Sequence, residues 1–377
     1  MKKEWKLRPL EKFQKRLLAW FRAHRRDLPW RRSRDPYRIW VAEVMLQQTR
    51  IAAVVPYYRR FLRRFPDVRS LAHAREEEVL KLWSGLGYYG RARNLHRAAK
   101  QIVAQHAGKF PRELDAALAL PGIGQYTAAA ILSIAYNEPL AVLDGNVARV
   151  LARLGAVRGE LRAAERWRDL GQRANRILAR SAAGDWNQAL MELGETICTP
   201  QSPGCGKCPV SRWCAAHARG LTDEIPAVRR KRAPVRIKIA AAILRDPLGR
   251  TILVKDPGAH DGVLFSRMWQ FPAVEVAHEP QRELAAHLKA TLDFHAGSLV
   301  ALPEARHGVT FRDIALLPFL ARVARLPKRP RTRIVPLERL SELPVSSATR
   351  KIAAAAGTVR LDGCPTRENQ TASFASS

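Results

Sequence analysis

Hydrophobic positions in the first part of the chain recur with the spacing of short amphipathic helices. Over residues 10–217 these helices are separated by Pro and Gly, and almost no segment alternates with the period of a strand. One helix is predicted over residues 37–48, because Asp35 is a typical N-cap and Pro36 suits the first helical position. Another is predicted over residues 147–154, behind Asp144. The first domain, residues 1–221, is therefore expected to be all-α.

The pattern changes in residues 222–236, which contain two prolines and the basic run Arg229-Arg230-Lys231-Arg232. Such a segment is typical of an exposed linker. Beyond it, residues 237–244 and 251–254 are predicted strands around a turn at Asp246-Pro247-Leu248-Gly249, and residues 282–292 are a predicted helix. The sequence thus predicts a smaller α/β domain over residues 237–356. Residues 357–377 are rich in Thr, Ser and small residues, so we expect a disordered tail.

Charge adds a prediction about the partner. The 377 residues include 65 Lys and Arg against 34 Asp and Glu, a formal charge of +31. Nucleic acid is the leading candidate, because Lys and Arg that neutralise phosphates release counterions. A solvated basic surface is the alternative. The sequence has neither a signal peptide nor an apolar run long enough to span a membrane, so we expect a soluble intracellular protein without membrane contact.

Four of the five cysteines, Cys198, Cys205, Cys208 and Cys214, fall within one window of 17 residues. In a reducing compartment, metal binding explains such a cluster better than disulfides do. The spacing offers four thiolates from one loop, which suits a cubane iron–sulfur cluster or a tetrahedral zinc ion. Zinc sites of four cysteines more often use two Cys-x2-Cys pairs. The spacing therefore favours the iron–sulfur cluster and leaves zinc as the alternative.

A turn with two glycines, Leu120-Pro121-Gly122-Ile123-Gly124, lies between two predicted helices. Its backbone N–H groups could closely approach a phosphate, although the turn alone is weak evidence. Further motifs surround it in the sequence: Leu28-Pro29-Trp30-Arg31, Asp35-Pro36-Tyr37, Glu43-Val44-Met45-Leu46-Gln47-Gln48-Thr49, Gly85-Leu86-Gly87-Tyr88-Tyr89 and Asp144-Gly145-Asn146-Val147. Together with the four cysteines, these motifs resemble the helix-hairpin-helix DNA glycosylases, and specifically the MutY-type adenine glycosylases, over most of residues 10–217.

The sister enzyme endonuclease III shares the hairpin and the cluster. Its family pattern implies a catalytic Lys where this chain has Tyr126. Without that amine, a lyase reaction through a Schiff base has no evident nucleophile here.

The chemistry of base excision agrees with the resemblance. Cleaving a purine N-glycosidic bond needs an acid to protonate the base and an anion to stabilise the cationic sugar. Glu43 lies among apolar residues, where burial should raise its pKa and suit it as the acid. Asp144 lies at a helix N-terminus, which should favour its ionised form and suit it as the anion. The simpler alternatives are a Glu43 that reaches solvent and an Asp144 that only caps its helix.

The resemblance also implies how the base is extracted and held. A base inside the duplex must be flipped out, and Gln48 resembles the side chain that fills the gap while Tyr88 resembles the wedge. Tyr88 could equally be an ordinary loop aromatic. The remaining residues carried over are Trp30, Arg31, Leu46 and Gln188 for the adenine pocket, Tyr126 and Asn146 as supports of the catalytic centre, and Gly122 and Gly124 for DNA.

The second domain more faintly resembles the Nudix-like domain with which MutY-type enzymes sense 8-oxoguanine, through Met268-Trp269-Gln270-Phe271-Pro272. A hydrolysing Nudix domain needs a Glu-rich metal helix, whereas Arg282-Glu283-Leu284 is followed here by Ala285-Ala286-His287. We therefore expect no pyrophosphatase activity. A general DNA-binding appendage is the alternative, because its arginines could bind phosphates alone.

The recognition loop of the second domain departs from a common family pattern. Many relatives have Phe-Ser-His there, whereas this chain has Val309-Thr310-Phe311-Arg312. Thr310 keeps a hydroxyl, which could pair with the N7–H and C8 oxygen of 8-oxoguanine. The His partner is lost.

The sequence thus predicts a monofunctional DNA N-glycosylase of base excision repair that removes adenine mispaired with 8-oxoguanine or guanine and leaves an abasic site. We expect a 4Fe-4S cluster as cofactor, mispaired double-stranded DNA as partner, a monomeric chain, and a cytoplasmic, nucleoid-associated location if the source is bacterial. One alternative is a pyrimidine-damage glycosylase and lyase of the endonuclease III type, which Tyr126 and the second domain oppose. The other is a non-catalytic DNA-binding protein, which Glu43 with Asp144 opposes.

Overall fold

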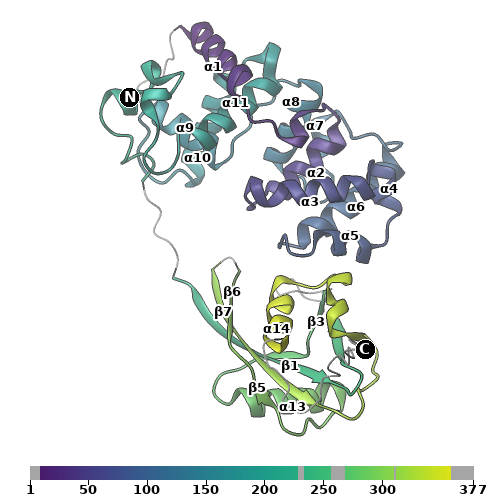
Figure 1. Cartoon of the computed structure of the whole chain (residues 1–377). Coiled ribbons are helices and arrows are strands. Elements are labelled where there is room, and N and C mark those ends of the chain that lie inside the picture. Colours follow the sequence, from purple (N-terminus) through teal and green to yellow (C-terminus); the bar gives the residue numbers. More distant parts are fainter. Residues whose placement is uncertain (1–8, 228–232, 256–267, 310, 358–377) are drawn as a thin grey trace, which may run out of the picture. The chain divides into compact units, whose positions relative to one another are not determined.

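The computed structural model describes residues 9–227, 233–255, 268–309 and 311–357. The chain divides into two compact units, Met1–Lys231 and Arg232–Ser377, and the division falls inside the segment expected to be a linker. In the described residues the first unit contains only helices and short 3-10 turns, whereas the second contains a sheet with helices (Figure 1). The predicted order of an all-α domain and an α/β domain is confirmed.

The described part of the first unit contains twelve α-helices. These are α1 Leu10–His24, α2 Pro36–Leu46, α3 Ile51–Arg64, α4 Val68–His73, α5 Glu76–Trp83, α6 Gly90–Gln105, α7 Leu114–Leu118, α8 Gln125–Tyr136, α9 Gly145–Leu154, α10 Ala164–Arg176, α11 Ala183–Thr196 and α12 Ala215–Ala218. The 3-10 turns are η1 Pro29–Arg31, η2 Arg180–Ala182, η3 Cys205–Lys207 and η4 Ser211–Trp213.

The two helix starts predicted from capping residues are confirmed. Asp35 accepts a hydrogen bond from the Tyr37 backbone N at 2.9 Å, and Asp144 accepts one from the Val147 backbone N at 2.7 Å. The predicted end of the first of these helices is wrong by two residues. Helix α2 ends at Leu46 because the chain turns into the left-handed region at Gln48, where φ is 57°.

Helix α11 packs against α1, α8 and α9 (Figure 1). Two glycines permit this close approach. A Cβ on Gly184 would lie 2.5 Å from the Ser133 carbonyl oxygen of α8, and one on Gly194 would lie 2.8 Å from the Asn146 Cβ of α9. The packing therefore brings side chains of α11 beside the start of α9 and the inner face of α8, where several candidate residues lie.

The second unit is built on a sheet that has eight strands in its described part, with the central order β3-β2-β1-β7-β5 and with β4 on β1, β6 on β7 and β8 on β2. Its elements are β1 Val235–Arg245, β2 Arg250–Lys255, β3 Trp269–Gln270, β4 Ala273–Glu275, α13 Pro280–Leu292, β5 Val300–Ala301, β6 Ala305–Val309, β7 Arg312–Arg322, β8 Thr332–Pro336, the 3-10 turn η5 Leu337–Glu342 and α14 Ser347–Gly357.

The parallel pair of β1 and β7 forms the centre of this sheet, and alternate side chains of β1 enter two cores. Ala241 and Ile243 pack in the core with α14, whereas Ala240 and Ala242 pack in the core with α13. Figure 1 shows the two helices on either side of the sheet. This burial on both faces explains why β1 is a nearly continuous apolar run.

Candidate active site

A pocket of about 310 Å³ lies among α2, α8, α9 and α11 in the first unit. It gathers residues that are far apart in the sequence. Nine of the predicted site residues line it: Trp30, Arg31, Glu43, Leu46, Gln48, Tyr126, Asp144, Asn146 and Gln188. Tyr88, Gly122, Gly124 and the four cysteines lie outside this lining, and Thr310 lies outside the described residues.

Glu43 lies on the buried side of α2, with 7% of its surface exposed. The Tyr126 hydroxyl of α8 donates a hydrogen bond to Glu43 Oε2 at 3.0 Å. The pKa of Glu43 is raised to about 7, because burial, with a smaller contribution from nearby Asp144, outweighs the hydrogen bond from Tyr126 and the charge of Arg31, which lower it. The predicted direction of this shift is confirmed, and Glu43 can hold a proton near neutral pH.

Asp144 caps α9, and the direction predicted for its pKa is wrong. The pKa is raised because burial disfavours the charged carboxylate more than the backbone N–H groups of Val147 and Asn146 and the charge of Arg149 favour it. The cap itself is present, with Asp144 Oδ1 accepting from the Val147 N–H at 2.7 Å. Two of the carboxyl groups that line the pocket, those of Glu43 in α2 and Asp144 at the start of α9, thus have raised pKa values.

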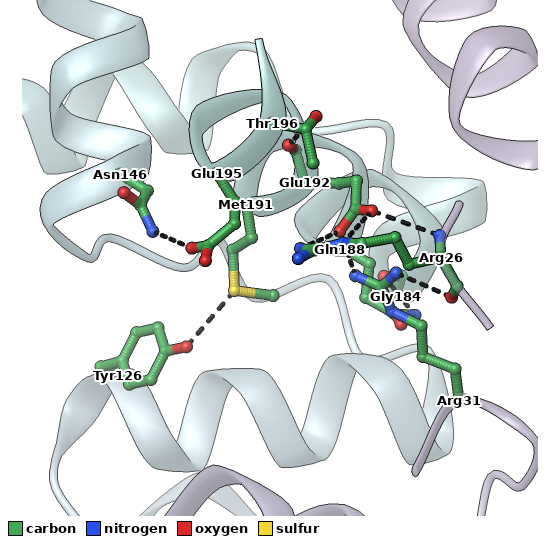
Figure 2. Close-up of polar contacts among 10 residues, drawn as sticks. All are labelled: Arg26, Arg31, Tyr126, Asn146, Gly184, Gln188, Met191, Glu192, Glu195 and Thr196. Carbon is green, nitrogen blue, oxygen red and sulfur yellow. Dashed lines mark hydrogen bonds and ion pairs between the residues drawn. The ribbon is translucent and has the colours of Figure 1, made fainter. Parts of the chain in front are cut away.

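Tyr126 and Asn146 are held by side chains of α11, as Figure 2 shows. The Tyr126 hydroxyl lies 3.3 Å from Met191 Sδ, and Asn146 Nδ2 donates to Glu195 Oε2 at 3.2 Å. Burial raises the pKa of Tyr126 well above its ordinary value, so the phenol keeps its proton. It therefore remains a donor that can fix the Glu43 carboxyl.

Glu192 of α11 is a buried carboxylate that the sequence analysis missed. Arg26 donates to it through Nε at 2.7 Å and through a terminal nitrogen at 2.8 Å, and Arg31 donates at 2.7 Å (Figure 2). Burial alone would raise the pKa of Glu192, but the hydrogen bonds and charges of Arg26 and Arg31 lower it to about 2. The three charged groups form a fixed wall of the pocket. The signal for Glu192 was available, since it lies on an apolar helix as Glu43 does.

The two residues expected to probe DNA share an unusual backbone conformation. Gln48 has φ 57° and Tyr88 has φ 49°, and Tyr88 is 40% exposed. Gln48 lines the pocket, two residues beyond the end of α2. Tyr88 belongs to the turn that joins α5 and α6.

The two glycines of the hairpin differ in their surroundings. Gly122 has φ 77°, and a Cβ there would lie 2.7 Å from the Asn94 Cβ. Gly124 starts α8 with φ −100°, and a Cβ there would meet nothing within 4 Å. Only Gly122 is required by the turn itself.

The cysteine loop holds four free, half-buried thiols, Cys198, Cys205, Cys208 and Cys214. The pKa of Cys208 is raised to about 12, chiefly because of burial, and the charges of the three neighbouring thiols contribute to this rise. Two arginines flank the loop. Arg153 donates to Cys198 Sγ at 3.3 Å, and Arg149 donates to the Cys198 carbonyl oxygen at 2.7 Å.

Four soft donors beside buried cations fit the ligand chemistry of an iron–sulfur cluster, whose thiolates carry negative charge. Among the residues that the structure describes, however, no three His, Cys, Asp or Glu side chains are placed as ligands of a metal ion. The donor set therefore fits the group by its chemistry alone.

In the second unit, β6 ends at Val309 and pairs antiparallel with β7, which starts at Arg312, and Thr310 of the expected recognition loop lies outside the described residues. The carboxylate of Glu283, in the first turn of α13, accepts hydrogen bonds from the backbone N–H groups of residues 277–279. These bonds tie Glu283 to the backbone of the loop that precedes α13. Within the described residues, every helix is too short or too polar to traverse a lipid bilayer.

The chain resembles several known proteins. A family model described as "HhH-GPD superfamily base excision DNA repair protein" matches residues 41–174. "Adenine DNA glycosylase" of Rattus norvegicus is 35% identical over 325 residues, covering 74% of this chain and 63% of the rat protein. "Adenine DNA glycosylase" of Homo sapiens is 44% identical over 224 residues, covering 57% of this chain and 41% of the human protein. The chain thus spans about half the length of these curated relatives.

Among solved structures, a thermostable thymine-DNA glycosylase is 30% identical, with a TM-score of 0.51, covering 56% of this chain and 97% of that one. This match spans nearly the whole thymine-DNA glycosylase, and it agrees with the match to the family model and with the similarity to adenine glycosylases. The chain therefore belongs to the HhH-GPD superfamily of base excision DNA repair proteins.

Proposed function

We propose that this chain is a monofunctional adenine DNA glycosylase. It flips an adenine that is paired with 8-oxoguanine or guanine out of the duplex and hydrolyses the N-glycosidic bond of that adenine. The observation that carries the proposal is one pocket that holds Glu43, with a pKa of about 7, together with the helix-capping Asp144. The similarity to adenine glycosylases of rat and human supports it.

Glu43 is the proposed general acid. Breaking the bond leaves electrons on the departing purine, so a proton delivered to a ring nitrogen stabilises the leaving group. With a pKa of about 7, Glu43 is protonated in a substantial share of molecules at neutral pH. The Tyr126 hydroxyl, 3.0 Å away, holds the carboxyl in place.

Asp144 is the proposed anion that stabilises the cationic sugar, as the second carboxylate does in glycoside hydrolysis. The backbone N–H of Val147 donates to its carboxylate at the N-terminus of α9, which fixes its orientation. No lysine is among the described residues that line the pocket. Water, rather than an amine, is therefore the proposed nucleophile that completes the reaction.

The wall of the pocket that Arg26, Glu192 and Arg31 form is proposed to hold the flipped base. Its hydrogen bonds fix the arginine side chains against one buried carboxylate, so the pocket is organised before the base enters. Trp30, Leu46 and Gln188 would complete the contact with the base.

The remaining assignments extend the proposal to the rest of the chain. The four cysteines are proposed to hold a 4Fe-4S cluster, which would shape their loop and its basic residues Lys207 and Arg212 against DNA. The second unit is proposed to be a Nudix-like domain that senses 8-oxoguanine through the hairpin of β6 and β7. A cytoplasmic, nucleoid-associated location for a monomer is proposed for a bacterial source.

The test uses the purified full chain and duplexes with adenine opposite 8-oxoguanine, adenine opposite guanine, adenine opposite thymine, thymine opposite guanine, and an oxidised pyrimidine opposite guanine. We expect breaks only in the first two duplexes, and only after alkali. Breaks without alkali, with an adduct trapped by borohydride, would support the endonuclease III type of reaction instead. Release of thymine would support the activity named for the thymine-DNA glycosylase relative.

A further inference from the structure

Arg91, in the first turn of α6, lies between two separate loops of the first unit. Its guanidinium lies 5.6 Å from the ring of Trp83 and 5.2 Å from the ring of Tyr88. Burial lowers the pKa of Arg91 to about 10, which still leaves the group charged at neutral pH. A half-buried cation needs several acceptors, and the structure supplies them from both loops.

The first set of acceptors comes from the end of the Glu43 helix. One terminal nitrogen of Arg91 donates to the carbonyl oxygens of Val44 and Met45 at 2.9 Å each, and also to that of Gln47. The carbonyls in the last turn of a helix lack partners within the helix, so the guanidinium satisfies them in place of water. The other terminal nitrogen donates to Thr49 Oγ1 at 3.2 Å.

The second set of contacts comes from the turn before α6. The same terminal nitrogen that reaches Thr49 donates to the Gly87 carbonyl oxygen at 3.2 Å. The backbone N–H of Arg91 donates to the Tyr88 carbonyl oxygen at 2.9 Å. The guanidinium therefore holds the residues on both sides of Gln48 and the carbonyl of Gly87 beside Tyr88, whereas the bond to the Tyr88 carbonyl comes from the main chain of Arg91.

These loops need such support, because Gln48 and Tyr88 both occupy the left-handed region. That conformation costs a residue other than glycine about 1 kcal/mol or more, and it persists where surrounding contacts enforce it. The two terminal nitrogens of the planar guanidinium share the five acceptors, while Nε has no partner among the described residues, and a single lysine ammonium in the same place could not reach both loops in this way.

We propose that Arg91 is a positioning residue that holds the Gln48 loop and the Tyr88 loop in a fixed position relative to each other, so that the side chains of Gln48 and Tyr88 act on the DNA together. The inference rests on the proposed function and deepens it, since it assigns the positioning of the two DNA-probing loops to one guanidinium. A purely structural role as a cap of α2 would also cost stability, so the test must separate the two.

The experiment is a mutant cycle on the full chain. It compares wild type, Arg91→Lys, the double variant Gln48→Ala/Tyr88→Ala, and the triple variant. Single-turnover excision of adenine opposite 8-oxoguanine is measured together with Tm. The matched control is Arg69→Lys, because Arg69 also donates to the carbonyl of a left-handed residue, Ala107, at 2.5 Å, but outside the pocket.

We expect Arg91→Lys to lower excision by roughly tenfold or more in the wild-type background and by less than about twofold in the double variant, while Tm falls equally in both. Arg69→Lys should leave excision unchanged. The proposal is overturned if Arg91→Lys keeps the wild-type rate, or if it costs the same factor in both backgrounds.

A second readout does not depend on excision. The fluorescence of 2-aminopurine placed beside the target adenine rises when the duplex is unstacked. We expect wild type to raise this fluorescence and Arg91→Lys to lose most of the rise. If wild type unstacks the duplex in this way but excises no adenine, the proposed function fails and the inference stands. An equal rise with Arg91→Lys overturns the inference.

Discussion

At the scale of single residues, the pocket shows how partners decide the state of a buried carboxyl. Glu43 and Glu192 are both buried, yet burial raises the pKa of Glu43 to about 7, whereas two arginines hold that of Glu192 near 2. Glu43 receives only a neutral hydroxyl from Tyr126. Glu43 on α2 can therefore deliver a proton while Glu192, on α11 of the same pocket, stays ionised.

The raised pKa of Glu43 predicts a cost to stability. Its folded pKa is about 7 against an ordinary 4.5, so its contribution favours folding below about pH 4.5 and is lost as the pH rises through 7. Glu43→Gln should remove this dependence and stabilise the protein by about 3 kcal/mol above pH 7, at 1.36 kcal/mol per pKa unit. Thermal unfolding near pH 5 and pH 8 checks this. A Glu43→Gln variant whose gain in stability is no larger at pH 8 than at pH 5 would contradict the raised pKa assigned to Glu43.

At the scale of elements, the two glycines of the hairpin before α8 differ in how strongly the turn requires a glycine. Gly122→Ala must place a Cβ at φ 77° and 2.7 Å from the Asn94 Cβ, whereas Gly124→Ala adds a Cβ into open space. We expect Gly122→Ala to cost about 1–3 kcal/mol of stability and to weaken DNA binding, and Gly124→Ala to cost less than about 1 kcal/mol. Denaturant unfolding and DNA titrations of both variants are the measurement. Equal costs would mean that the turn does not depend on the left-handed residue.

The cysteine loop predicts a metal content. Purified protein prepared without oxygen should carry about four irons per chain and be yellow-brown, because four thiolates from one loop suit a cubane cluster. Cys205→Ser should weaken DNA binding, since the loop is expected to position basic residues. Elemental analysis of the wild type decides between the metals, and one zinc per chain in place of iron would contradict the prediction.

The sequence predicted the helix starts at Asp35 and Asp144 because capping is local, within three residues of the cap. It predicted the end of α2 wrongly, because the Gln48 turn is held by Arg91, more than forty residues on. The wall of Arg26 and Glu192 was missed for the same reason, since 166 residues separate the two. The pKa of Asp144 went the opposite way because burial, which one sequence does not reveal, outweighed the helix terminus.

At the scale of the whole molecule, the two units are expected to divide excision and sensing. Deleting residues 235–377 should leave some excision by the pocket, which lies wholly in the first unit. It should remove most of the preference for adenine opposite 8-oxoguanine over adenine opposite guanine. Single-turnover rates and binding constants on the two duplexes measure this. Equal discrimination by the truncated and full chains would mean that the second unit is not the sensor.

The most direct test of the account is single-turnover excision of adenine opposite 8-oxoguanine by wild type, Glu43→Gln and Asp144→Asn, with DNA affinity measured alongside. Glu138→Gln, which alters a surface ion pair with Arg112, serves as the control. The account predicts that each pocket variant loses at least about a hundredfold in rate while it keeps its affinity, because the acid and the anion act in the transition state. A nearly normal rate in either pocket variant would contradict the role assigned to that carboxyl.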